Sequence, residues 1–398
     1  MIRVLLVGLV FGRDFLHLYQ LHPDVGHVGL CDTDPALLAE VGDLYGVRDR
    51  WLDLDAALAG GDYDVVHLAT PVASHAALAV RVLRTGRSVG VAVPMATSLE
   101  DVDRVLEAAS AGSGRYMMLE TGVFGREYLE VSRAHAAGEL GRLIHLRGAH
   151  LQDLDGFPPY WMGFPPMHYA THVLGPLLAL ARTQVRDVRC LGSGTLSDEH
   201  RGAHGPSFPW ESALMTTGTD VAIEATVSFF DTARGYSEGF SVYGERGSFE
   251  WPQAEDDPPV TYRAAALGAP GRGRALEVRR AHAPDRPDLL PEALRPWTSS
   301  GPYTSPAGQV VSVSSTHSGS HAHLVHELVR TVAEGRPSVV DEVAAARMSA
   351  PGIVAHQSAL AGGTVLPVPQ YGDDVPRGGP LLPHSDEQDR PTRGRGTA

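Results

Sequence analysis

The sequence contains no lysine. All 33 positively charged residues in the chain of 398 are arginines. This absence excludes a Schiff-base lysine, a lysine general base and the lysine of a phosphate-binding P-loop. Acidic residues outnumber the arginines, and the net charge of −14 argues against nucleic acid or a membrane surface as partner, because both reward clustered positive charge.

Cysteine and long apolar runs are scarce as well. Cys31 and Cys190 are too few for a disulfide framework and lack metal-ligand spacing. No apolar run reaches the roughly 18 residues that a membrane-spanning helix needs. The apolar N-terminus has no signal-peptide cleavage site and continues into a strand–helix pattern. These absences predict a cytoplasmic protein with no membrane segment.

What is present is an alternation of strand-like and helix-like segments over the first 121 residues. Residues 2–10 form a nearly continuous apolar run, which is typical of a parallel strand buried on both faces. Further strand-like runs lie at 27–32, 64–70, 88–93 and 116–120, separated by helix-like runs ending near 21, 46, 86 and 112. The alternation predicts a Rossmann-type, doubly wound parallel sheet.

The pattern changes after residue 121. A helix-like run at 126–141 precedes strand-like runs at 143–151, 185–194, 213–230 and 239–251. These predict a mainly antiparallel open sheet with one face covered by helices. Residues 252–310, rich in Pro, Gly, Arg and Asp, predict a long excursion, and helices are expected at about 321–335 and 341–360.

The predicted fold class is therefore α/β followed by α+β. A Rossmann domain is expected at residues 1–121 and a substrate and oligomerisation domain at 122–368. The tail at 369–398 has few apolar residues and is predicted to be disordered.

The first strand is followed by a degenerate nucleotide-binding turn. Gly8 and Gly12 suit the G-x-G-x-x-G pattern, in which glycines let a pyrophosphate approach the helix N-terminus. Val10 occupies the second glycine's place, Phe11 follows it, and Arg13 falls where the third glycine belongs. The two glycines alone are also compatible with a simple tight turn.

Asp32, at the end of the second strand, strengthens the nucleotide prediction. A carboxylate there binds the ribose hydroxyls and repels a 2′-phosphate, which favours NAD over NADP, with Thr33 beside it. The alternative is a helix cap, because Asp32, Thr33 and Asp34 all suit that position.

Residues 64–102, DVVHLATPVASHAALAVRVLRTGRSVGVAVPMATSLEDV, resemble the Gfo/Idh/MocA oxidoreductases (glucose–fructose oxidoreductase and inositol dehydrogenase). The positions that carry the resemblance are Thr70, Pro71 and His75, and then Ala92, Val93 and Pro94, where the family has Glu-Lys-Pro. The likeness extends from residue 1 to about 365. It implies NAD(P)-dependent hydride transfer at a sugar or polyol carbon, with these residues at the cofactor.

Later segments resemble a branch of the same superfamily made of NAD-dependent glycosidases, which also has valine in the lysine's place. That branch carries a Tyr-Pro-Thr-His-x-x-Gly-Pro segment, echoed here by Tyr169, Ala170, Thr171, His172, Gly175 and Pro176. Its glycine-rich histidine loop is echoed around His317. The branch implies redox-assisted elimination with a recycled NAD, although Ala92 and Ala170 depart from its signature.

The segment HYATH carries the predicted catalytic residues. His172 suits a general base because its pKa is easily moved across neutrality, and on a helix Tyr169 and His168 would share its face. The two histidines lack a third metal ligand, so no metal is predicted. The alternative is that His168 or Tyr169 is a satisfied polar residue at a domain interface. His323 and His326 are expected to be solvated.

Four further residues are predicted to contact substrate. Tyr160 and Trp161 are suited to stack on a sugar face, or to pack a loop onto the core. His317 is expected to reach the site. Glu120 ends a strand at the sheet edge where ligands bind, or caps the next helix.

Three functions remain open. The first is an NAD(P)-dependent sugar or polyol dehydrogenase, against which the missing lysine counts. The second is a glycoside-cleaving enzyme that recycles NAD, and the third is a non-catalytic nucleotide- or sugar-binding homologue. The family's open sheet face further implies a homo-oligomer, a dimer or a tetramer.

Overall fold

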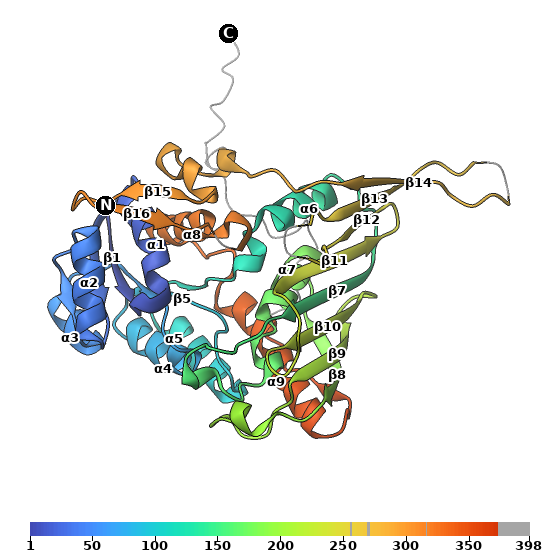
Figure 1. The fold of residues 1–398 in the computed structure, drawn as a ribbon, viewed down its shortest axis with the longest axis horizontal. Coiled ribbons are helices and arrows are strands. Elements are labelled where there is room, and N and C mark those ends of the chain that lie inside the picture. Colours follow the sequence, from blue (N-terminus) through green and yellow to red (C-terminus); the bar gives the residue numbers. More distant parts are fainter. Residues whose placement is uncertain (255–256, 269–270, 316, 373–398) are drawn as a thin grey trace, which may run out of the picture.

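The computed structural model describes residues 1–254, 257–268, 271–315 and 317–372. Most of the predicted tail at 369–398 therefore lies outside the described residues. Two sheets dominate the fold, and Figure 1 shows them on opposite sides of the molecule with helices between them.

The first sheet has six parallel strands in the order β3-β2-β1-β4-β5-β6. Its strands are β1 (Ile2–Val7), β2 (Val25–Cys31), β3 (Arg50–Trp51), β4 (Val65–Leu68), β5 (Ser88–Val91) and β6 (Tyr116–Met118). Its helices are α1 (Leu9–Leu21), α2 (Pro35–Tyr45), α3 (Leu54–Gly60), α4 (His75–Leu83) and α5 (Leu99–Ala111). The predicted Rossmann sheet is confirmed, and the short β3 and α3 are additions.

Local signals fix where these helices begin and end. The Asp34 carboxylate accepts hydrogen bonds from the backbone N–H groups of Ala36 and Leu37, so Asp34 is the cap of α2. Gly46 ends the same helix in the left-handed conformation, with φ of 69°. Asp34, and not Asp32, therefore caps α2, so the alternative of Asp32 as the cap of this helix is wrong.

The second sheet has nine strands in the order β14-β13-β12-β11-β7-β10-β9-β8-β17. They are β7 (Leu143–Leu151), β8 (Val185–Ser193), β9 (Trp210–Thr217), β10 (Ala222–Ser228), β11 (Ser237–Gly244), β12 (Gly247–Glu250), β13 (Val260–Ala264), β14 (Leu276–Arg280) and β17 (Leu366–Pro367). Only β7 and β10 pair in parallel within this sheet. The mainly antiparallel sheet is confirmed, and the predicted run at 213–230 divides into β9 and β10.

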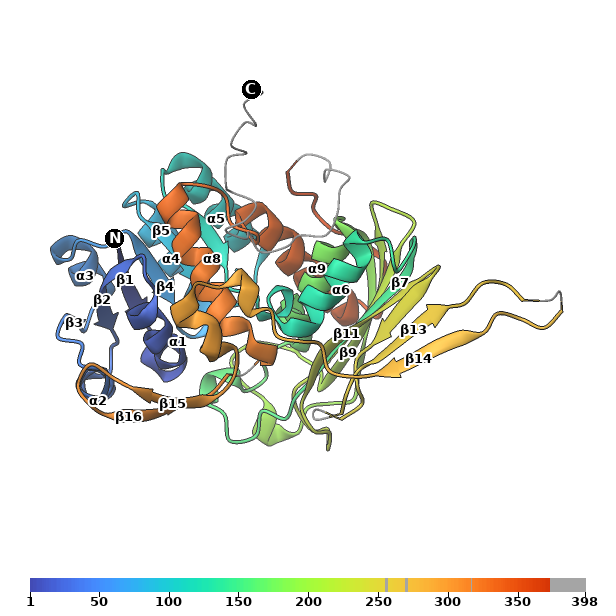
Figure 2. The same ribbon diagram turned by 90° about the horizontal axis from the view of Figure 1, so that it is seen from above.

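Three helices cover the inner face of this sheet. Figure 2 shows α6 (Arg126–Ala136) and α9 (Glu342–Leu360) between the two sheets, and α7 (Thr171–Ala181) packs on β7 and β11. The outer face is open, and Leu191 and Leu214 are more than half exposed there. The prediction of one helix-covered face is therefore confirmed.

The predicted excursion at 252–310 is more ordered than expected. It contains β13, β14 and β15 (Gly301–Thr304), which forms a hairpin with β16 (Val310–Val313). Tyr303 of this hairpin joins the apolar cluster of α1 and α2, and α8 (Ser320–Glu334) packs on α1. Chain from the predicted second domain thus returns to cover the first.

No helix among the described residues is long and apolar enough to cross a membrane.

Candidate active site

A cleft of about 1400 Å³ separates the two sheets. One wall is the carboxyl edge of the parallel sheet, where α/β folds bind their ligands. The other wall is formed by the loops and strand ends on the inner face of the second sheet. The cleft is large enough for a dinucleotide together with a sugar, since pockets for drug-sized ligands take about 300–1,000 Å³.

Gly8 and Asp32 shape the nucleotide end. A Cβ on Gly8, whose φ is 86°, would lie 2.5 Å from the Ala69 carbonyl oxygen, so only glycine fits. The helix α1 begins at once with Leu9, whose N–H donates to Asp32 Oδ2 over 2.7 Å. Asp34 N–H donates to the other carboxylate oxygen over 2.9 Å. A carboxylate accepts about four hydrogen bonds, so Asp32 retains capacity for ribose hydroxyls.

The third glycine of the motif is Gly12, and the prediction that Arg13 takes that position is wrong. A Cβ on Gly12 would lie 3.2 Å from the Leu6 side chain and 3.5 Å from the Ala69 Cβ. Gly12 therefore permits the close helix–strand packing for which the motif uses its last glycine. Arg13 instead pairs with Glu40 over 3.4 Å at the surface. The loop is one residue short because α1 starts directly after Gly8.

Val10 and Phe11 line the cleft with exposed apolar side chains, 67% and 37% exposed. Both stand in the first turn of α1, where backbone N–H groups have no intrahelical partner and favour an anion. Together with the close approach allowed at Gly8 and the carboxylate of Asp32, this chemistry fits a dinucleotide. Thr33 and Thr70 with Pro71 also line this end.

The corner that replaces Glu-Lys-Pro is apolar. Ala92 and Val93 line the cleft, and Val93 is only 6% exposed. His75 is buried; its Nδ1 lies 2.8 Å from the Pro94 carbonyl oxygen and its Nε2 2.7 Å from that of Thr70. His75 therefore ties the two cofactor-side corners together, and no titratable side chain stands where the family has its lysine.

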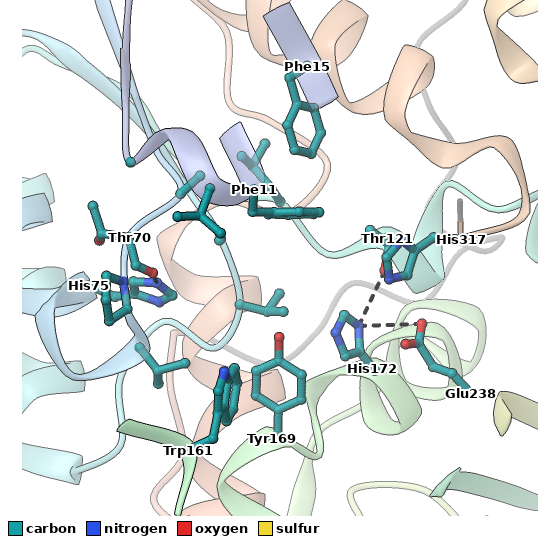
Figure 3. Close-up of a pocket in the computed structure, with 18 of the residues that line it drawn as sticks. Phe11, Phe15, Thr70, His75, Thr121, Trp161, Tyr169, His172, Glu238 and His317 are labelled. Carbon is teal, nitrogen blue, oxygen red and sulfur yellow. Dashed lines mark hydrogen bonds and ion pairs between the residues drawn. The ribbon is translucent and has the colours of Figure 1, made fainter. Parts of the chain in front are cut away.

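His172 is the centre of the opposite wall (Figure 3). It lies in the first turn of α7, and its Nδ1–H donates to Glu120 Oε1 over 2.8 Å. Thr121 Oγ1 is 3.3 Å and a Glu238 oxygen 3.6 Å from the same nitrogen. Burial alone would lower the pKa of His172, but the carboxylates of Glu120 and Glu238 outweigh it and raise the pKa to about 9. His172 is a cation at neutral pH.

Tyr169 stands beside this cation. Its ring centroid is 5.0 Å from that of His172, and Figure 3 shows its hydroxyl directed into the cleft below Phe11. Burial raises the pKa of Tyr169, so the phenol keeps its proton. Trp161 packs edge-on against Tyr169, with 5.3 Å between centroids, and Tyr160 is 44% exposed at the rim. Both predicted aromatic residues line the cleft.

His168 does not share this wall, so the expectation of one helical face is wrong. Pro166–Tyr169 form a separate 3₁₀ turn, and α7 begins only at Thr171. The His168 ring packs 5.0 Å from His356, whose Nδ1 is 2.7 Å from Glu211 Oε1. The other oxygen of Glu211 accepts the Met167 N–H. His168 is half-buried and packs on the side chains that support the turn, outside the residues that line the cleft.

Glu120 and His317 reach the site in different ways. Glu120 is fully buried; it caps the turn Thr121–Val123 through the Gly122 N–H and holds His172, so it acts behind the surface that substrate would touch. His317 lines the cleft, stacked on His172 with centroids 6.1 Å apart. Its backbone φ of 51° is unusual for a residue other than glycine and marks a strained turn at the site.

The expectation that His323 and His326 are solvated is wrong. Both lie on α8 and are buried, and His326 Nδ1 lies 3.0 Å from His22 Nε2. Burial lowers the pKa of His323 to about 4. The reason is that α8 packs against α1, so the face that carries these histidines is covered.

Sequence reasoning missed two important cleft residues, His150 and Glu238. They are register partners on β7 and β11, so only strand pairing brings them together. Burial lowers the pKa of His150 to about 4, which leaves it neutral. Burial would raise the pKa of Glu238, but His172 and His317 lower it to about 2. The available signal was that His150 falls on the inward-facing phase of a predicted strand.

Among the described residues, no group of three or more His, Cys, Asp or Glu side chains is arranged to hold a metal ion.

Comparison with known proteins confirms the family resemblance. Residues 2–120 match the Gfo/Idh/MocA family, described as an oxidoreductase family with an NAD-binding Rossmann fold. The match covers the first sheet and its helices, and the chemistry of Gly8 and Asp32 agrees with the NAD binding that this description gives.

Some of the proteins similar in sequence to this chain are glycosyl hydrolases, in agreement with the glycosidase resemblance. A glycosyl hydrolase family 109 protein 1 of Bacteroides fragilis (strain YCH46) is 26% identical over 244 residues, which are 55% of this chain and 50% of that protein. A glycosyl hydrolase family 109 protein of Streptomyces niveus is 27% identical over 293 residues, 63% of this chain and 58% of that protein. The chain thus spans about half the length of the curated relatives it matches.

The fold is shared with solved structures. A levoglucosan dehydrogenase in complex with NADH and L-sorbose superposes with a TM-score of 0.74 at 17% identity, over 93% of this chain and 99% of that one. The likeness confirms the two-sheet architecture.

Proposed function

We propose that this relative of the Gfo/Idh/MocA oxidoreductases binds NAD in the cleft and transfers hydride at a hydroxyl-bearing carbon of a sugar or polyol. The observation that carries the proposal is His172, which faces the cleft and is held on its other nitrogen by Glu120 over 2.8 Å. A proton-transfer group fixed in this way suits the conversion of an alcohol to a carbonyl and back.

The residues of the first wall bind the nucleotide. Gly8 and the first turn of α1 receive the pyrophosphate, while Asp32 accepts from the ribose hydroxyls and disfavours the 2′-phosphate of NADP. When bound, NAD supplies the hydride acceptor. Ala92, Val93, Phe11 and the Thr70–Pro71 corner exclude water from the space beside it.

The residues of the second wall move the proton. With Nδ1–H donated to Glu120, the opposite nitrogen of His172 is available to the substrate oxygen. The protonated ring stabilises negative charge on that oxygen and donates its proton for carbonyl reduction. The deprotonated ring accepts the proton of an alcohol, and this form becomes more abundant as the pH rises toward the His172 pKa of about 9. The Tyr169 phenol provides a second hydrogen bond at the same place. His172 thereby takes over the positive charge that the family obtains from its lysine.

A second candidate is glycoside cleavage by redox-assisted elimination with a recycled NAD. In that reaction a transient ketone acidifies the neighbouring C–H, a base removes that hydrogen, and the glycosidic oxygen departs. The observation that favours it is a second imidazole on the same wall: burial keeps His150 neutral, and its ring lies 5.5 Å from His172. The valine at position 93 agrees with the same branch.

One experiment separates the candidates. The NAD-loaded protein is incubated in D₂O with free sugars, polyols and glycosides, and NADH release and product deuteration are followed. A dehydrogenase accumulates NADH and leaves C2 unlabelled. The elimination enzyme releases sugar that carries deuterium at C2 without net NADH. If neither occurs with any compound, hydride chemistry on carbohydrates is rejected and the binding-homologue alternative stands.

We further propose that the chain works as a homo-oligomer, a dimer or a tetramer, in the cytoplasm. The open face of the second sheet, with Leu191 and Leu214 exposed, supports self-association. Light scattering of the full chain tests this: a single monomer mass at micromolar concentration contradicts it.

Fractionation of the source cells tests the cytoplasmic location. The proposed domain boundaries at residues 121 and 368 are tested by expressing each segment alone.

A further inference from the structure

A side chamber opens from the substrate end of the cleft, next to His172. It has a volume of about 120 Å³, and Glu127, Glu238 and Trp251 line both the chamber and the main cleft. Since a water molecule takes up about 30 Å³, the chamber has room for one small substituent of a larger molecule.

Glu127 contributes a carboxyl group with one oxygen that lacks a hydrogen-bond partner among the described residues. It lies in the first turn of α6 and is 6% exposed, and the Ser318 hydroxyl hydrogen-bonds to it. Its Oε2 atom has no hydrogen-bond partner among the described residues. A buried carboxylate oxygen without a donor is costly, and burial accordingly raises the pKa of Glu127. The arrangement lacks a hydrogen-bond donor.

Glu238 contributes a second carboxylate that stays ionised. The Tyr236 hydroxyl donates to its Oε2 over 2.6 Å, and His172 Nδ1 is 3.6 Å from its Oε1. Its side chain is 10% exposed. Because a carboxylate accepts about four hydrogen bonds, these two neighbours leave Glu238 able to accept from a ligand.

Aromatic rings form the rest of the chamber. Trp251 and Phe240 lie with their centroids 5.8 Å apart and both line it. The face of an aromatic ring attracts a cation, and tryptophan does so most strongly. Carboxylates and aromatic faces together are the lining that a substituted ammonium group prefers.

The positive groups at this end offer little to an anion. Arg126 lines the cleft, but its Nε donates to Asp285 Oδ1 over 2.8 Å and its terminal nitrogen to the Thr298 carbonyl oxygen. The His172 cation is already matched by Glu120 and Glu238. A carboxylate or phosphate on the substrate would therefore meet excess negative charge.

We infer that the side chamber binds an ammonium group and that the substrate is an amino sugar or an amino polyol. This inference rests on the proposed function, because it names the substrate class of the same cleft. The amine would donate to the carboxylates of Glu127 and Glu238, and its adjoining carbons would pack on Trp251.

The test measures binding to the NAD-loaded full chain by calorimetry. The probes are amino hexoses with the amine at C2, C3 or C6 and an amino inositol, each beside its hydroxyl parent, its N-acetyl derivative and glucuronate. At least one amine should bind about tenfold more tightly than its parent, the factor expected for one charge-assisted hydrogen bond. Acetylation should remove the preference, and glucuronate should bind most weakly.

A matched pair of variants assigns the effect. Glu127→Gln should reduce the amine preference to below roughly threefold, since a neutral amide loses the charge-assisted bond. Glu130→Gln, on the same helix but paired with Arg133 at the surface, should keep the full preference. Circular dichroism verifies that both variants are folded, and the acetylation result is independent of any variant.

The outcomes distinguish this inference from the proposed function. If every amine binds no more tightly than its hydroxyl parent, or if the Glu127→Gln variant keeps the preference for amines, the chamber does not bind an ammonium group. NADH formation from neutral sugars without amine preference leaves the proposed function standing and removes this inference. Amine-selective binding without hydride transfer to NAD from any probe supports the ammonium-binding chamber and contradicts the proposed function.

Discussion

The two walls of the cleft differ in chemistry. The Rossmann wall meets the cleft with apolar side chains such as Val10, Phe11 and Val93, and Asp32 stands at its far end. The opposite wall concentrates titratable groups: His172 is held between two glutamates, with Tyr169 and His150 alongside. One wall is shaped for a nucleotide, and the other for moving protons.

This difference explains how the site can work without lysine. A lysine in the usual corner would place its charge on the cofactor wall, whereas here the charge stands across the cleft on His172. The carboxylates of Glu120 and Glu238 maintain that charge against burial. Position 93 on the cofactor wall carries no charge, and the cationic group of the site is His172 on the opposite wall.

The largest effect is expected for His172→Ala. Removing the proton-transfer group should lower turnover at least ~10²-fold, while NAD affinity, which depends on the other wall, stays unchanged. Steady-state kinetics and NAD titration measure the two quantities. His168→Ala is the matched control, because His168 lies outside the cleft; if it costs as much activity in a folded protein, the assignment to His172 fails.

Tyr169→Phe should also lower turnover at least ~10²-fold if the phenol takes part in proton transfer. The ring and its packing on Trp161 are preserved, so thermal stability should change little. A turnover close to that of the unaltered protein would remove Tyr169 from the mechanism and leave the second wall with His172 alone.

On the opposite wall, Asp32→Ala should weaken NAD binding by about 10- to 30-fold, as expected for the loss of two hydrogen bonds to ribose of about 1 kcal/mol each. NADP affinity should fall less or rise, because the carboxylate no longer repels the 2′-phosphate. Calorimetry with both nucleotides gives the ratio. An unchanged ratio would mean that Asp32 serves only as the cap of Leu9.

The smallest effect on rate at neutral pH is expected for Glu120→Gln. The pKa of His172 is raised to about 9 with Glu120 in place, so the rate of carbonyl reduction should hold until the pH approaches that value and then fall. In the variant the fall should begin at lower pH, closer to the ordinary histidine value of about 6.5. A pH–rate profile that does not move would show that Glu120 does not hold the charge.

The fold was largely predictable because the alternation of apolar runs and helical segments is a local property of the chain. The two-residue strand β3 and the seven-residue helix α3 are too short to show a clear periodicity of apolar residues. The hairpin of β15 and β16 escaped prediction because its partner, the surface of α1 and α2, lies far away in the sequence.

The site divides in the same way. His172, Tyr169 and His317 were predicted from motif and residue type. Glu238 was missed because only the register of β11 against β7 sets it beside His150. His168 was misplaced because helical spacing was assumed across a 3₁₀ turn, and the role of Glu120 required knowledge of the backbone after β6.

The most direct test is a stopped-flow experiment on the NAD-loaded protein mixed with a panel of sugars, amino sugars and glycosides, following the absorbance of NADH within one turnover. Both catalytic candidates require at least transient NADH. The account predicts that one or more compounds produce it in the unaltered protein, and that His172→Ala, with NAD equally bound, does so at least ~10²-fold more slowly. No NADH with any compound, or equal rates in the two proteins, would contradict it.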